Sequence, residues 1–145
     1  MRNTALCLAL WVLPIACAGG PSGIAGETVS SGTTRLAPPV GSWQLVSFAR
    51  SNDAVAPEVT LILQQDGSIA GSGGCNGYFA TWSLGQGQSS LGPIGATRRM
   101  CEPDIMDVEM RYFDALSKVA GWLPADAGIL LVDEAGDALL RFRSQ

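Results

Sequence analysis

Short apolar segments separated by turn residues dominate the chain from residue 41 onward. In "EVTLILQQ" (58–65), apolar residues alternate with more polar neighbours, as they do in a strand with one buried face. Asp66-Gly67 follows, and both residue types tolerate the positive φ of a tight hairpin turn. We therefore predict that residues 58–65 form a strand that pairs with a second strand at 68–73.

Similar segments lie on both sides of this hairpin. "GSWQLVSF" (41–48) predicts a strand before it, and further strands are predicted at about 77–84 and 89–95. Pro93 makes the last of these an edge or bulged strand. The C-terminal "GILLVDEAGDALLRFR" predicts two more strands around a Glu-Ala-Gly-Asp turn.

One segment, "EPDIMDVEMRYFDALSKVAG", has the spacing of an amphipathic helix. Pro103 suits the first helical position, Asp104 lies in the first turn, and Gly121 is the predicted stop. Two pairs of opposite charge, Asp107 with Arg111 and Asp114 with Lys118, are four residues apart on the polar side. The predicted apolar face consists of Ile105, Val108, Tyr112, Leu116 and Val119, widened by Met106, Met110 and Phe113.

The predicted elements come in the order strands, one helix and a final hairpin. This order indicates an α+β domain in which one helix covers a small antiparallel sheet. The domain would span residues 40–145, a common size for a single domain.

The N-terminus has the layout of a secretory signal peptide. Arg2 precedes an apolar run that is shorter than the roughly 20 residues of a membrane-spanning helix, and Pro14 would interrupt a core helix. "LPIACAGG" resembles a bacterial lipoprotein signal, although Pro14 stands where that pattern usually has Leu, Val or Ile. We expect residues 1–17 to form the cleaved signal-peptide segment, cut immediately before Cys17, which then becomes the lipid-bearing N-terminus. Ordinary cleavage at Ala16-Cys17-Ala18 is the alternative, and it would release a soluble periplasmic or secreted protein.

Residues 18–39 are rich in Gly, Ser, Thr and Pro, which predicts a flexible tether. Cleavage removes Arg2 and no acid, so the formal charge becomes more negative than −4. Basic residues form no stripe along the chain, which argues against nucleic acid as a partner.

"GSGGCNGYFATW" (71–82) places four glycines around Cys75. A phosphate-binding loop would lead into a helix and carry a lysine, whereas this segment leads into β-prone aromatic residues. A nucleophilic cysteine normally needs a base, most often histidine, and the chain has none. A metal site is also poorly supported, since the domain has two cysteines and no imidazole. We expect no cofactor and no metal.

In an exported protein the two domain cysteines, Cys75 and Cys101, are expected to pair. The bond would close a loop of about 27 residues and stabilise the domain by roughly 3.5 kcal/mol in the chain-entropy model. The glycines would then let one strand bend close to the segment before the helix. A pair of free buried thiols is the alternative.

These segments resemble the META domain family, which includes the heat-inducible protein HslJ. "GSGGCNGYFATW" is similar to its G-C-N-x-[YF] signature, and "ATRRMC" to its second signature, T-x-M-A-C. Glu109, Phe113 and Leu116 match the family's Glu, aromatic and Leu on the following helix. Arg99 and Met100 depart from the pattern, because the family usually has Met and Ala there. The resemblance covers residues 41 to 143.

The resemblance implies a compact, β-rich, partly barrel-like fold with one helix, found in bacterial envelope proteins. It implies no established catalytic activity, and it links the chain to stress and antibiotic tolerance. We therefore expect a non-enzymatic binding or interaction module of the cell envelope, whose partner is an envelope protein or an apolar ligand bound at a sheet face or barrel mouth.

The alternative is an acid-based hydrolase. Glu102, Asp104 and Asp107 form the one local cluster of acids, and paired carboxyl groups divide acid and base roles where burial separates their pKa values. Acids in the first turn of a helix are, however, also explained by the helix dipole. The hypothesis requires two of these acids to lie together in a cleft.

Arg98 and Arg99 are candidates for contact with a lipid phosphate or a partner's carboxylate. The alternative is a solvated pair that balances the nearby acids. Asn76 is interpreted as a turn residue whose side chain satisfies backbone groups of the loop.

Overall fold

The computed structural model describes residues 37–49, 51, 55–85 and 88–145. The predicted signal peptide, including Cys17, and most of the predicted tether lie outside the described residues. The described fold is therefore that of the predicted domain.

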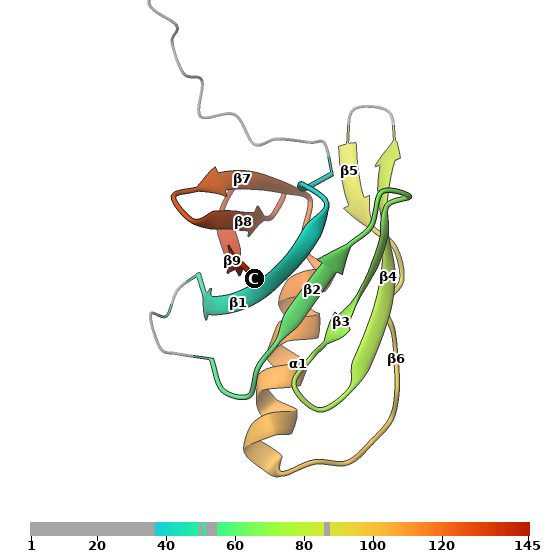
Figure 1. Ribbon diagram of the computed structural model, residues 1–145, viewed down its shortest axis with the longest axis vertical. Helices are drawn as coiled ribbons and strands as arrows, with labels where there is room; N and C mark the ends of the chain where they lie inside the picture. The colour runs from blue at the N-terminus through green and yellow to red at the C-terminus, as the bar shows by residue number, and fades with distance from the viewer. Residues whose placement is uncertain (1–36, 50, 52–54, 86–87) are drawn as a thin grey trace, which may run out of the picture. The chain divides into compact units, whose positions relative to one another are not determined.

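The described residues form nine strands and one α-helix (Figure 1). In chain order the elements are β1 (Gly41–Phe48), β2 (Thr60–Leu63), β3 (Ser68–Ser72), β4 (Gly77–Gly85), β5 (Gln88–Leu91), β6 (Gly95–Ala96), α1 (Pro103–Ser117), β7 (Gly121–Ala125), β8 (Gly128–Val132) and β9 (Ala138–Ser144).

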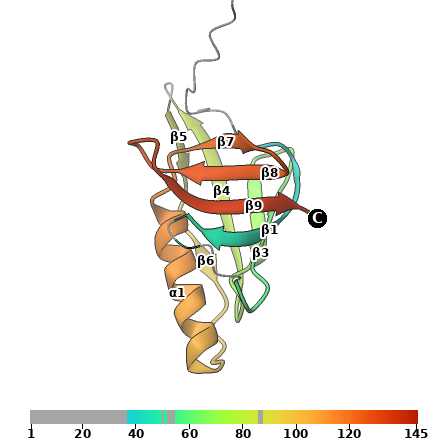
Figure 2. The same ribbon diagram turned by 90° about the vertical axis from the view of Figure 1, so that its left-hand side faces the viewer.

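The strands form one antiparallel path in the order β5-β4-β3-β2-β1-β9-β8-β7, with β6 paired to β4 outside this path. The strands at its two ends, β5 and β7, have Cα atoms within 8 Å of each other. The sheet therefore curls around the core without closing (Figures 1 and 2). The predicted α+β class, with a partly barrel-like antiparallel sheet and one helix, is confirmed.

The first and last strands of the domain are neighbours. β1 pairs with β9, for example Phe48 with Leu140. At the other end of this pair the backbone N–H of Gln145 donates to the carbonyl of Ser42, with 3.0 Å between N and O. The ends of the domain thus meet on one side of the sheet.

The predicted hairpin at Asp66-Gly67 is confirmed. β2 pairs with β3, and Gly67 has φ +81°, the left-handed conformation that the turn requires. One carboxyl oxygen of Asp66 accepts from the backbone N–H of Ser68 at 2.9 Å and from its hydroxyl at 2.6 Å. The hydroxyl bond above all, and then the backbone bond, lower the pKa of the Asp66 carboxyl.

Two details of the predicted strands differ from the structure. The single strand predicted at 89–95 is two short strands, β5 and β6, with Pro93 in the connection between them. β7 was not predicted, and Gly121, the predicted helix stop, begins this strand instead. The helix ends earlier, at Ser117, where the backbone N–H of Lys118 donates to the carbonyl of Ala115.

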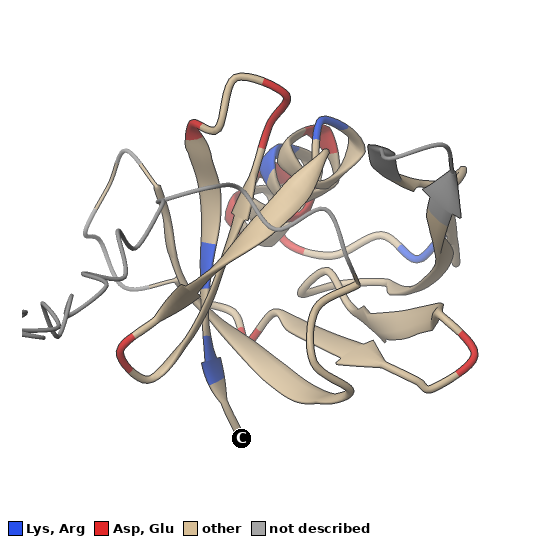
Figure 3. Cartoon of the chain, turned by 90° about the horizontal axis from the view of Figure 1, so that it is seen from above, with Lys and Arg blue, Asp and Glu red and all other residues tan. Residues whose placement is uncertain are grey.

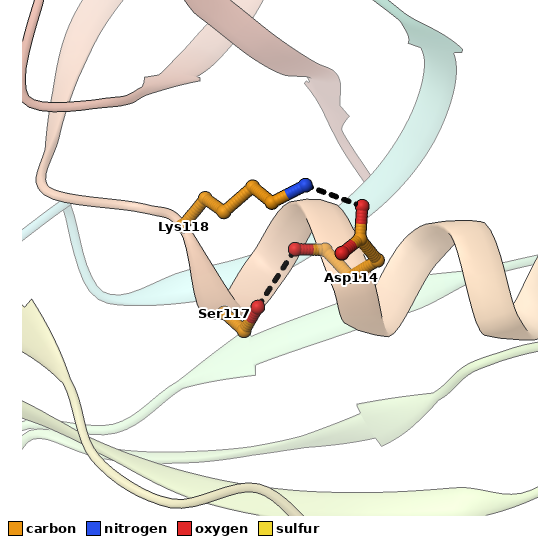
Figure 4. A network of polar contacts seen from close by, with 3 residues as sticks. All are labelled: Asp114, Ser117 and Lys118. Carbon is orange, nitrogen blue, oxygen red and sulfur yellow. Dashed lines mark hydrogen bonds and ion pairs between the residues drawn. The ribbon is translucent and has the colours of Figure 1, made fainter.

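The helix begins with Pro103 as its first residue, as predicted. Both predicted charge pairs form, with Nζ of Lys118 2.7 Å from Oδ2 of Asp114 and the Arg111–Asp107 pair at 3.9 Å. Figure 4 shows the first pair together with the Ser117 hydroxyl, which donates to the carbonyl of Asp114 at 2.8 Å.

The helix packs against strands from both halves of the sheet. Tyr112 is fully buried, and its ring lies in edge contact with Tyr78 of β4 and Phe142 of β9. Leu116 is also fully buried, but Met110, predicted on the apolar face, is 66% exposed. The apolar face of α1 is therefore narrower than its sequence predicts.

Inward-facing residues of the sheet complete the core, and the predicted alternation in β2 is confirmed by buried Leu61 and Leu63. Trp43 and Trp82 are buried and Trp122 is half-buried. The largest fully buried side chains are Tyr112, Phe142, Leu61, Leu63, Ile69, Leu116, Ile129, Leu131, Leu140, Val59 and Val132.

The described residues before β1 also belong to the packed domain. Ala37 packs against the core and Pro38 is buried. The indole N–H of Trp43 donates to the carbonyl of Pro39 at 3.2 Å. The last residues of the predicted tether thus lie against the domain.

Candidate functional site

The carboxyl group of Glu109, 5% exposed, lies at the centre of a buried polar network. Its Oε2 accepts from the backbone N–H groups of Cys75 at 3.2 Å and Asn76 at 2.6 Å. Its Oε1 accepts from the side-chain amide of Asn76 at 2.7 Å. One helix side chain therefore satisfies three donors of the loop between β3 and β4, and leaving such donors buried and unpaired is costly.

The Asn76 side chain connects this loop to the segment before the helix. Its Oδ1 accepts from the Arg99 backbone N–H at 2.6 Å and from the Thr97 hydroxyl at 2.8 Å, and its Nδ2 donates to the Arg99 carbonyl at 3.2 Å. Asn76 thus satisfies backbone groups, as its interpretation as a turn residue predicts. The two hydrogen bonds between the Asn76 side chain and the Arg99 backbone resemble those between residues of two paired strands.

A covalent bond joins the same two segments. Cys75 and Cys101 form a disulfide with their Cα atoms 6.0 Å apart, as expected from the sequence. Nη2 of Arg99 donates to the carbonyl of Cys75 at 2.8 Å, so part of its hydrogen-bonding capacity is used within the fold. Arg98 and Arg99 are both exposed, and their contact with a phosphate or carboxylate stays a prediction.

The glycines of "GSGGCNGYFATW" permit this close packing. A Cβ at Gly73 would lie 2.9 Å from the Phe113 ring and 3.0 Å from the Glu109 side chain. Gly74 has φ +111°, which side-chain-bearing residues rarely adopt. Gly73 lets the loop lie directly against α1, and Gly74 lets its backbone turn there. The first signature therefore has a structural role.

Arg99 and Met100, the two residues that depart from the second signature, are both exposed, so the fold accommodates them. Arg99 points its guanidinium back to the loop, and Met100 is 95% exposed. Neither side chain is forced into the core, and Cys101 keeps its place in the disulfide.

A second polar contact lies between the two tyrosines. The hydroxyl groups of Tyr78 and Tyr112 are 2.6 Å apart, and that of Tyr78 also donates to the carbonyl of Thr60 at 3.0 Å. Burial raises the pKa of both phenols, most strongly that of Tyr112. Both hydroxyls are thus used to join α1 to the sheet.

The predicted cluster of acids is not a buried pair. Glu102, Asp104 and Asp107 are each exposed, and Asp107 pairs with Arg111 on the surface. The hydrolase hypothesis required two of these acids to lie together in a cleft, and this arrangement does not support it.

The outer face of β2, β3 and β4 presents an apolar row to solvent. Ile62 pairs with Ala70, Ala70 with Phe79, and Phe79 with Gly95 of β6. Phe79 is 67% exposed and Ile62 is 41% exposed. We call Ile62, Ala70 and Phe79 the outer row.

Two further properties of the domain bear on function. Within the described ranges, no group of three or more His, Cys, Asp or Glu side chains converges as metal ligands would. No helix in this part of the chain is long and apolar enough to cross a membrane.

Sequence reasoning missed Glu109 as the centre of the network, and it noted this residue solely as a match to the family pattern. A signal was present, however. Glu109 follows Ile105 by four residues and precedes Tyr112 by three, which places it on the apolar face of the helix. An acid at such a position has to find donors in the core.

Comparison with known proteins extends this picture. The sequence profile of the META domain matches residues 35–145. An NMR structure of a protein from Burkholderia xenovorans is 25% identical, covers 80% of this chain and 97% of its own, and superposes with a TM-score of 0.55. A second protein solved by NMR is 19% identical, covers 72% of this chain and 88% of its own, and has a TM-score of 0.51, which shows the fold alone. None of the curated proteins compared with the chain matches it.

Proposed function

The chain belongs to the META domain family, and on this premise we propose that it is a non-enzymatic binding module of the bacterial cell envelope, active under stress. A lipid on Cys17 would hold it at a membrane, and the domain would bind its partner directly. Soluble periplasmic or secreted export is the alternative.

The observation that carries this proposal is the outer row. A folded domain gains little from exposing a large aromatic ring, and grouped exposed apolar side chains on a sheet mark interaction sites. Phe79, at 67% exposed, lies next to Ala70 and close to Ile62 across three paired strands. This part of the surface is therefore the proposed contact site.

The hydrogen bonds of the polar signature residues, Glu109 and Asn76, agree with a non-enzymatic role. The side chains of Glu109 and Asn76 use their oxygens and amide within the network described above. Groups engaged in this way hold the fold together and are not free to act on a substrate.

The test is rescue of a strain that lacks the gene. Survival after heat shock or treatment with a cell-wall antibiotic is compared for the wild-type chain, Phe79→Ser and a control, Met110→Ser. Met110 is 66% exposed and lies on α1, away from the outer row in sequence and element. We expect wild type and Met110→Ser to restore survival and Phe79→Ser to fail, at equal protein levels.

The same rescue experiment also tests the three acids of the hydrolase hypothesis. Glu102→Gln, Asp104→Asn and Asp107→Asn are expected to rescue as well as the wild type, singly and combined. Loss of rescue by any one of them, in a protein that is present and folded, would overturn the proposal in favour of the hydrolase.

A further inference from the structure

The strands from β1 to β6 contain no charged residue. Figure 3 shows the charged positions in the helix, the loops and other strands, and the described parts of these strands without red or blue. The solvent-facing side of an antiparallel sheet normally carries polar and charged residues, which maintain solubility. The absence of charge from six consecutive strands therefore requires an explanation.

The solvent-facing residues of β2, β3 and β4 bear hydroxyl groups around the outer row. Strand pairing places Thr60 beside Ser72 on one side of the row and Ser68 beside Thr81 on the other. We call the outer row together with these four residues the neutral face. It combines an aromatic ring, two aliphatic side chains and four hydroxyls. The Ser68 hydroxyl donates its proton to Asp66, whereas those of Thr60 and Ser72 accept from the backbone N–H groups of Ser72 and Gly74 and keep their protons for a ligand.

The Phe79 ring lies down on the sheet. A Cβ added at Gly95 would lie 2.3 Å from Cζ of Phe79 and within 2.8 Å of both ε carbons, so the far end of the ring covers this glycine. The side chain nevertheless remains 67% exposed. One side of the ring is thus supported by backbone while much of its surface faces solvent, which is the geometry of a stacking platform.

We propose that the neutral face binds an uncharged glycan. The C–H groups of a sugar ring carry a slight positive charge and stack on the negatively polarised face of an aromatic ring. Sugar hydroxyls exchange hydrogen bonds with Ser and Thr hydroxyls, directly or through water. A neutral ligand needs no charge on the protein, and the neutral face offers none.

Other occupants fit this surface less well. A phosphate-bearing lipid or polymer is recognised by Arg and Lys, and these strands have neither. Protein interfaces are enriched in Arg and Met as well as in Trp, Tyr and Phe, and of these residues the neutral face has Phe79 alone. Two acids flank β2 among the described residues. Asp66 in the β2–β3 turn is bound to Ser68, and Glu58 before β2 accepts from the side-chain amide of Gln145. Both carboxyl groups could also accept hydrogen bonds from sugar hydroxyls.

The glycan assignment rests on the proposed function, since it names the partner class of the same site. The test is calorimetric titration of the purified full chain with three uncharged oligosaccharides: cellohexaose, maltohexaose and chitohexaose. We expect at least one to bind, Phe79→Ala to weaken binding by about tenfold or more, and Met110→Ala to leave it unchanged. Because no ion pairs contribute, affinity should change less than about twofold between low and high salt.

A second variant guards against a folding defect. Gly95→Ala keeps the Phe79 ring but displaces it from the sheet, because the added methyl would lie 2.3 Å from Cζ, which is too close for two non-bonded carbon atoms. It should also weaken binding, while circular dichroism shows both variants to be folded.

Three results would overturn the glycan assignment: absence of binding by all three oligosaccharides, equal weakening by Met110→Ala, or a concentration-dependent dimer that Phe79→Ala abolishes. The last result would mean that the neutral face binds a second copy of the chain. If no oligosaccharide binds but Phe79→Ser still fails to rescue the deletion strain, the glycan assignment falls and the binding-module proposal stands. If Phe79→Ser rescues fully, the binding-module proposal falls as well.

Discussion

Glu109 on α1 binds Asn76 in two ways at once. Its Oε2 accepts the backbone N–H of Asn76 at 2.6 Å, and its Oε1 accepts the side-chain amide at 2.7 Å. Asn76 in turn binds the backbone of Arg99. The helix, the β3–β4 loop and the segment before the helix are thus joined through a single amide.

Replacing Glu109 should therefore be costly. Glu109→Ala leaves the backbone N–H groups of Cys75 and Asn76 without this partner and removes one of the two hydrogen bonds that Nδ2 of Asn76 donates. We expect it to lower the free energy of unfolding by about 3 kcal/mol. Urea denaturation measures the change. Glu102→Gln changes an exposed acid at the N-cap of the same helix, so it serves as control and should stay within about 0.5 kcal/mol. Equal effects of the two substitutions would contradict a central role for Glu109.

The disulfide should add stability without being required for the fold. Cys75→Ser combined with Cys101→Ser is expected to lower the free energy of unfolding by about 2–4 kcal/mol. The hydrogen bonds of Glu109 and Asn76 hold the same segments, so the domain should keep its native circular dichroism spectrum. An unfolded double variant would show that the network alone is insufficient. Intact mass should rise by about two hydrogens when the native chain is reduced.

The two tyrosines of the chain, Tyr78 and Tyr112, should make the domain sensitive to alkali. Burial raises the pKa of both phenols in the folded state above the unfolded value of about 10. Their contribution to stability is therefore fully present below pH of about 10 and is lost as the pH rises toward the folded pKa.

Tyrosinate absorbance and circular dichroism, followed together during a pH titration, test this prediction. Because both tyrosines of the chain are buried, no tyrosinate signal should appear before the fold is lost. Ionisation near pH of about 10 in a protein that keeps its native spectrum would contradict the buried Tyr78–Tyr112 contact.

Gly71 should tolerate no side chain. A Cβ there would lie 2.1 Å from the carbonyl oxygen of Thr60, so Gly71→Ala must distort the β2–β3 pair. We expect a loss of about 2–3 kcal/mol in thermal or urea unfolding. Gly77→Ala on the neighbouring strand is the matched control, because its Cβ would meet the nearest atom at an ordinary 3.7 Å. A harmless Gly71→Ala would mean that these strands are farther apart in solution.

The mass of the chain isolated from a bacterial envelope tests the proposed anchor. Lipidation predicts a chain that begins at Cys17 and carries diacylglycerol and acyl groups, and Cys17→Ser should abolish this increment. A bare chain that begins after Ala18 would instead identify a soluble exported protein.

Local signals explain which elements the sequence predicts. Pro103 marks the helix start, and Asp66-Gly67 defines the hairpin, because each acts through its own backbone preferences. The sequence does not predict β7, because "GWLPA" has no clear alternation of apolar and polar residues. It also contains Pro124, and proline suits an edge strand but argues against an interior one. Its place depends on pairing with β8, which the local sequence does not encode.

In the candidate site, too, some features can be predicted from the sequence and others depend on the tertiary structure. The pairing of Cys75 with Cys101 was expected from their number and the predicted export, whereas the bond from Glu109 to Asn76 depends on two segments 33 residues apart. The outer row was also not foreseen. Ile62 and Phe79 lie at polar-side positions of their strands, and their alignment across β3 becomes visible once the register is known.

The meeting of Gln145 with Ser42 has a practical consequence for engineering this domain. Domains whose ends lie close together tolerate circular permutation. A short linker from Gln145 to the segment before β1, with new ends opened in the exposed Asp66 turn, would keep every strand pairing of the sheet. A fluorescent protein fused after Gln145 would instead lie beside the start of β1, whereas one inserted at the Asp66 turn would lie beside Ser68 of the neutral face.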